Sequence, residues 1–80
     1  MRVLIERTYL TTAQGTRVLY LLPDKFIVEA GDLQEAIVHF IENGGGRLLG
    51  CVTQSTPARA VATGWSEGQL FMISAEPAPD

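Results

Sequence analysis

The segment GDLQEAIVHFIENGGG, residues 31–46, predicts one helix with both of its ends marked. Asp32 is a favourable N-cap residue, and Glu35 stands three positions further on, where a capping box places its acid. Apolar residues then recur at the spacing of a single helical stripe: Leu33, Ala36, Ile37, Phe40 and Ile41. The pattern therefore predicts an amphipathic helix of about twelve residues, roughly 18 Å long.

Three glycines, Gly44 to Gly46, follow this helix, and we interpret them as its end. The residue past the last helical turn often adopts a left-handed conformation, which glycine tolerates best. A phosphate-binding loop instead places its glycines before a helix, so that the first amides of the helix point at the anion. The run also lacks the Lys-Ser/Thr ending of a nucleotide-binding loop. The glycines therefore predict a cap and a turn.

Strands are predicted on both sides of the helix, from runs of Val, Leu, Ile, Tyr and Thr that are separated by turn residues. They cover residues 1–10, 16–22, 25–30, 47–54, 58–64 and 69–75, with a hairpin loop at 65–68. The predicted order is β-β-β-α-β-β-β. This is an α+β fold, a two-layer sandwich in which a single helix lies on one face of a mainly antiparallel sheet of five to six short strands. Residues 1–75 are expected to form one domain, and residues 76–80 a flexible C-terminal tail.

Composition limits the class of protein. A chain of 80 residues has room for one core. Its single cysteine, Cys51, and single histidine, His39, exclude an intramolecular disulfide and a closed zinc site of Cys and His ligands. The net charge of −3 argues against a nucleic-acid partner, and neither a membrane span nor a signal peptide is apparent. We expect a cytoplasmic protein with no metal, no cofactor, no nucleic-acid partner and no membrane partner.

Several predicted strands are apolar on both faces, whereas a half-exposed strand alternates apolar with polar residues. In the last strand, one face carries Phe71 and Ile73 and the other carries Leu70 and Met72. One helix covers only one face of a sheet. Either the sheet closes into a small barrel, or its second face contacts another molecule, most simply a copy of the same chain in a two-fold dimer. We favour the dimer, because oligomerisation commonly stabilises small domains that have no disulfide or metal.

The predicted function follows from this second face. We expect a protein that acts by association, as a homo-oligomer or as a regulatory or inhibitory partner of another protein. The candidate interface residues are Leu19, Leu21, Leu70, Met72 and Trp65. Trp65 is either an interface anchor, since aromatic residues dominate interface energies, or a lid over one end of the sheet.

No catalytic residues are predicted. Cys51 and His39 form the only thiol–imidazole combination, and a reactive thiol needs exposed, electropositive surroundings, whereas Cys51 is predicted among apolar neighbours. The monomer alone is therefore not expected to be an enzyme. The alternative function is a small-ligand binding domain, or an enzyme, whose pocket forms at the subunit interface. The candidate pocket residues are Arg7, Arg17, Tyr20 and His39.

Overall fold

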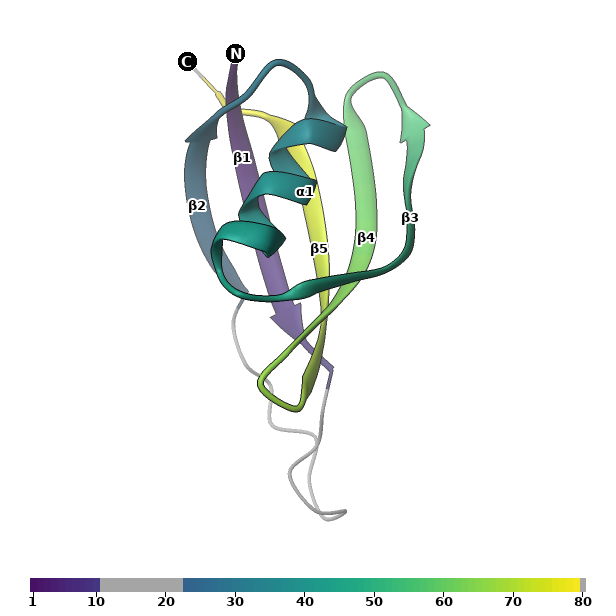
Figure 1. The fold of residues 1–80 in the computed structure, drawn as a ribbon. Coiled ribbons are helices and arrows are strands. Elements are labelled where there is room, and N and C mark those ends of the chain that lie inside the picture. Colours follow the sequence, from purple (N-terminus) through teal and green to yellow (C-terminus); the bar gives the residue numbers. More distant parts are fainter. Residues whose placement is uncertain (11–22, 80) are drawn as a thin grey trace.

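The computed structural model describes residues 1–10 and 23–79, leaving aside the side chain of Ser55. Within these residues it contains one helix and five strands (Figure 1). The elements are β1 (Arg2–Tyr9), β2 (Asp24–Glu29), α1 (Leu33–Asn43), β3 (Arg47–Thr56), β4 (Arg59–Ser66) and β5 (Gln69–Pro77). The strands form a single antiparallel sheet in the order β2-β1-β5-β4-β3, and α1 lies across one face of it. This confirms the predicted α+β architecture.

The sheet is open rather than closed into a barrel, because β2 and β3 are the two edges of its described part. The predicted strand at residues 16–22 lies outside the described residues, so the observed order is β-β-α-β-β-β. The last strand is longer than the pattern suggested, since β5 continues through Glu76 and Pro77. Glu76 is paired with Leu4, and the N–H of Ala78 donates to the carbonyl of Arg2 at 2.9 Å. The start of β1 supplies these backbone partners. Glu76 and Pro77 therefore belong to the sheet, although the sequence predicts a flexible tail for residues 76–80.

Both ends of α1 follow from the residues that flank it. Asp32 is the N-cap, and its Oδ1 accepts a hydrogen bond from the N–H of Glu35 at 2.8 Å. At the other end, the N–H groups of Gly45 and Gly46 donate to the carbonyls of Glu42 and Ile41, at 3.0 and 2.9 Å. This is the Schellman pattern, and it places Gly45 in the left-handed region with a φ of 77°. Gly44 has an ordinary φ of −83°, so the left-handed residue lies one position later than Asn43-Gly44 suggested.

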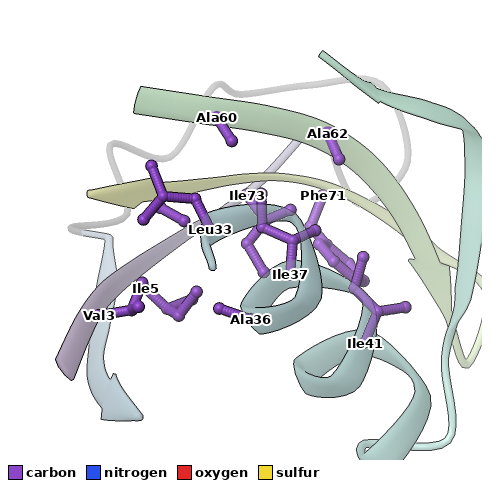
Figure 2. Close-up of a cluster of buried hydrophobic side chains, with 11 residues drawn as sticks. Val3, Ile5, Leu33, Ala36, Ile37, Ile41, Ala60, Ala62, Phe71 and Ile73 are labelled. Carbon is purple, nitrogen blue, oxygen red and sulfur yellow. The ribbon is translucent and has the colours of Figure 1, made fainter. Parts of the chain in front are cut away.

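The hydrophobic core lies between α1 and the sheet (Figure 2). The helix contributes four buried side chains of the predicted stripe, and the inner strands contribute the others. From β1, β4 and β5 these are Val3, Ile5, Ala60, Ala62, Phe71, Ile73 and Ala75. Because β4 presents only small side chains at this level, the larger residues of α1 and β5 fill the space between the layers. The second face of the sheet is covered by no element of the described chain.

Two backbone features shape the strands that follow α1. Glu67 and Gly68 form a two-residue hairpin turn with φ values of 51° and 80°, as a type I′ turn requires. Trp65 therefore belongs to β4, not to the loop at 65–68 that the sequence suggested. In β3, the pairing with β4 shifts between Leu49 and Thr53, where Gly50 has a φ of 73°. Gly50 thus lies in a β-bulge, a usual position for a glycine inside a strand.

Candidate functional site

One candidate site is the face of the sheet opposite α1, here called the helix-free face. Successive side chains of a strand point to opposite faces, so the neighbours of the core residues lie on this one. Its apolar members are Leu4, Ile27, Leu49, Val61, Trp65, Leu70 and Met72. Ile27, Leu49, Trp65 and Met72 remain 38% to 49% exposed. These are large apolar side chains that the described part of the chain leaves in contact with water.

Strand pairing brings three of the predicted interface residues together on the helix-free face. Trp65 lies directly opposite Leu70 across β4 and β5. One row further along, Thr63 of β4 lies opposite Met72 on one side and Leu49 of β3 on the other. Opposed residues on one face have Cβ atoms about 5 Å apart, so Trp65, Leu70 and Met72 share a continuous patch. The remaining two candidates, Leu19 and Leu21, lie outside the described residues.

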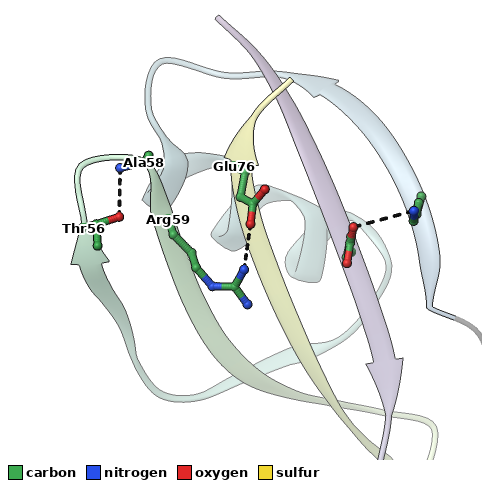
Figure 3. A network of polar contacts seen from close by, with 6 residues as sticks. Thr56, Ala58, Arg59 and Glu76 are labelled. Carbon is green, nitrogen blue, oxygen red and sulfur yellow. Dashed lines mark hydrogen bonds and ion pairs between the residues drawn. The ribbon is translucent and has the colours of Figure 1, made fainter. Parts of the chain in front are cut away.

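Two pairs of opposite charges form on the helix-free face. Arg59 Nη1 contacts Glu76 Oε1 at 2.7 Å across β4 and β5 (Figure 3). Lys25 Nζ lies 3.9 Å from Glu6 Oε1 across β2 and β1. A shallow hollow of about 210 Å³ lies beside these pairs, lined by Glu6, Thr8, Arg59, Val61, Met72, Ile73 and Ser74. The face therefore combines exposed apolar side chains with two ion pairs formed within the chain.

A second candidate site is a cavity of about 340 Å³ between α1 and β2, on the other side of the sheet. It is lined by Arg7, Val28, Glu29, Ala36, His39, Phe40, Asn43 and Gly44. Two of the four predicted pocket residues, Arg7 and His39, thus meet in one cavity, formed within a single chain. Arg17 and Tyr20 lie outside the described residues. Val28, Phe40 and Asn43 were not predicted as pocket residues, although Phe40 belongs to the apolar stripe of the helix.

Arg7 is enclosed by aromatic rings at the floor of this cavity. Its Cζ lies 5.0 Å from the ring centre of Tyr9, 5.3 Å from that of Phe26, 5.7 Å from that of Phe40 and 6.0 Å from that of Phe71. Rings within about 6 Å attract a guanidinium through their quadrupoles. Arg7 Nη2 also donates to Asp24 Oδ2 at 3.0 Å. The charged group is therefore held in one place from several sides.

The Nε atom of Arg7 is buried and has no hydrogen-bond partner among the described residues. Beside Arg7 lies a second, much smaller cavity of about 20 Å³, lined by Arg7, Phe40, Ile41, Gly44, Gly46, Ser66 and Phe71. A space of this size has room for one water molecule, since about 10–15 Å³ is needed to hold one. Ser66 provides a hydroxyl on the same wall. We expect an ordered water between these two side chains.

The thiol and the imidazole are not brought together. His39 lies over the β2 edge of the sheet, whereas Cys51 lies on β3, which is the opposite edge. Cys51 is exposed rather than packed among apolar neighbours, because the bulge at Gly50 interrupts the regular pairing there. In the described ranges, no group of three or more His, Cys, Asp or Glu side chains is arranged to hold a metal ion. Over the same ranges, no helix has the length and apolar character needed to cross a membrane.

Comparison with known proteins adds no relative. No protein-family model, no curated protein and no solved structure matches this chain.

Proposed function

We propose that the protein acts by association, and that its functional unit is a two-fold dimer in which the helix-free faces of two copies pack together. The observation that carries the proposal is the exposure of Trp65, Met72, Leu49 and Ile27 on one face of the sheet. Burying a fully exposed side chain of this kind contributes about 1.5–3 kcal/mol, so covering the 38% to 49% that remains exposed on four of them contributes about 2–6 kcal/mol in total. This is a substantial part of the free energy of unfolding, which is about 5–15 kcal/mol for typical proteins.

The size of the helix-free face suits such a dimer. The sheet has five strands, spaced about 4.8 Å apart, and each strand has about eight residues with a rise of about 3.3 Å per residue. The area of its face is therefore roughly 600 Å². Because side chains project from this plane, the accessible surface area of the face is larger. A stable interface of standard size buries about 800 Å² on each partner. Two such faces, stacked about 10 Å apart as in a β-sandwich, therefore bury enough surface for a specific dimer.

The charge pattern of the helix-free face favours a second copy over a charged partner. A two-fold axis places the same patch on both sides of the interface, so any net charge on the patch would repel its copy. Here Arg59 is paired with Glu76, and Lys25 with Glu6, within each chain. By their register Arg2, Glu29 and Arg47 lie on this face as well, so it holds both signs of charge in nearly equal number and little net charge to recruit a nucleic acid. The single thiol of the chain, Cys51, is exposed, which suits a reducing compartment. We therefore propose the cytoplasm as the location of the protein.

Light scattering coupled to size-exclusion chromatography tests the proposal. At micromolar concentration the wild-type chain is expected to have twice the monomer mass of 8.7 kDa. Met72→Glu is expected to give a monomer, because burying a carboxylate in an apolar interface is strongly unfavourable. Gln34→Glu, an exposed position on α1, is the matched control and should remain a dimer. A wild-type monomer at every concentration would refute the proposal, and so would a dimer that tolerates Met72→Glu.

A further inference from the structure

The aromatic rings around Arg7 leave most of its hydrogen-bond donors free. A ring face stabilises a guanidinium electrostatically, but it does not use up an N–H group as an oxygen acceptor does. Of the five N–H groups of Arg7, one is committed to Asp24 among the described residues. The guanidinium is therefore fixed in position, partly removed from water and still able to donate.

The cavity above Arg7 has the size and lining of a small-molecule site. Its volume of about 340 Å³ is at the lower end of the range of ligand pockets, about 300–1,000 Å³. Val28, Ala36 and Phe40 form an apolar wall, and the polar side chains of His39 and Asn43 lie on the helix side. An apolar wall with a few convergent polar groups is the usual composition of such pockets. A compact ligand with an apolar body and one polar end matches this lining.

We propose that the cavity between α1 and β2 binds a small organic carboxylate, with the carboxylate on Arg7 and the apolar body against Val28, Ala36 and Phe40. A carboxylate matches the paired donors of a guanidinium. Asp24 is bonded to Arg7, Glu29 lines the cavity, and Glu35 lies 3.9 Å from His39. These carboxylates repel a doubly charged phosphate more than a monoanion. The site is independent of the proposed dimer, because it lies on the helix side of the sheet.

Nuclear magnetic resonance titration tests this proposal with three probes: benzoate, benzamide and inorganic phosphate. Benzoate is expected to shift the backbone amide signals of the cavity residues Val28, Ala36, Asn43 and Gly44, together with the side-chain Nε–Hε signal of Arg7. Benzamide has the same shape without the charge and should bind about tenfold more weakly, since a hydrogen bond to a charged group is stronger than a neutral one. Phosphate should leave these signals in place. Equal responses to all three probes, or no response to benzoate, would overturn the proposal.

Two variants connect the response to the cavity. Arg7→Lys keeps the charge but loses the paired donors, and it should weaken benzoate binding by about tenfold. Because Arg7 is packed among four rings, a second variant at an exposed position guards against misfolding. Asn43→Trp should fill the cavity and abolish the benzoate shifts, whereas Gln34→Trp, on α1 but outside the cavity lining, should retain them. Benzoate shifts that persist in Asn43→Trp would show that the probe binds elsewhere.

Discussion

Gly64 lies directly opposite Phe71 on β4 and β5, and the Phe71 ring occupies the space where a side chain at residue 64 would begin. Phe71 is almost completely buried, and its ring meets that of Tyr9 edge-on at 5.9 Å. The same ring contributes to the enclosure of Arg7. Because Gly64 has no side chain, β4 leaves room for the Phe71 ring. This ring supports both the core and the floor of the α1–β2 cavity.

Gly64→Ala is therefore expected to destabilise the fold by about 1–3 kcal/mol, as for other overpacked cores. The added Cβ would collide with the Phe71 ring, which is almost completely buried. Urea unfolding followed by circular dichroism measures the change. In a Phe71→Leu background the same substitution should cost less, because the ring is gone. An equal cost in both backgrounds would show that the contact with Phe71 is not the cause.

The two glycines at the end of α1 should respond differently to alanine. Gly45 has a φ of 77°, and an alanine there is expected to lower the free energy of unfolding by about 1–2 kcal/mol. Gly44 has a φ of −83°, and a Cβ there would lie 3.4 Å from the Phe40 carbonyl, which is van der Waals contact. Gly44→Ala should therefore be close to neutral or slightly stabilising. Thermal unfolding of the two variants side by side checks the assignment, and the reverse order would contradict it.

Trp65 reports on the proposed dimer, because it is the only tryptophan in the chain. In a single chain it is 42% exposed, so dilution that separates the copies should shift its emission to longer wavelength. Trp65→Ala is expected to weaken self-association by about 2 kcal/mol, or roughly thirtyfold in Kd. Sedimentation equilibrium measures that change, with Trp65→Phe as the control that keeps an aromatic ring. Emission that stays constant across dissociation would place the indole outside the interface.

Cys51 provides a chemical probe of the same surface. Its neighbour Val52 packs against the core, so Cys51 lies on the helix-free side of β3, and it is exposed in a single chain. Its rate of reaction with a thiol reagent should fall as protein concentration rises and dimers form. In the Met72→Glu variant the rate should be high at every concentration. A wild-type rate that does not depend on concentration would mean that β3 lies outside the interface.

The helix and the faces of the strands could be predicted from local pattern alone. The cap at Asp32, the apolar stripe and the glycines at the end of α1 are separated by only a few residues, so their physics is contained in residues 31–46. Alternation within residues 25–30 likewise predicts that Phe26 and Val28 share one face and Ile27 lies on the other; in the structure Phe26 and Val28 pack against the core and Ile27 is exposed. Both signals depend on neighbours along the chain.

The predictions from sequence differ from the structure where residues pair with partners that are distant in sequence. The sequence pattern predicts a strand that ends at Gly64 and a loop that begins at Trp65, because the pairing of Trp65 with Leu70 is not visible from neighbouring residues. Glu76 and Pro77 have the composition of a tail, but β1 offers them backbone partners. The enclosure of Arg7 could not be predicted either, because its four rings come from β1, β2, α1 and β5. Only the sheet order brings these elements to one place.

The bulge at Gly50 has a consequence for the size of the proposed assembly. An exposed edge strand is a template on which further chains add one after another, and such growth has no natural end. At Gly50 the backbone of β3 bends and loses its regular pairing, which spoils that template on one side of the sheet. Contact through flat faces, by contrast, is complete once two copies have met. The bulge thus favours a closed pair over an open-ended filament.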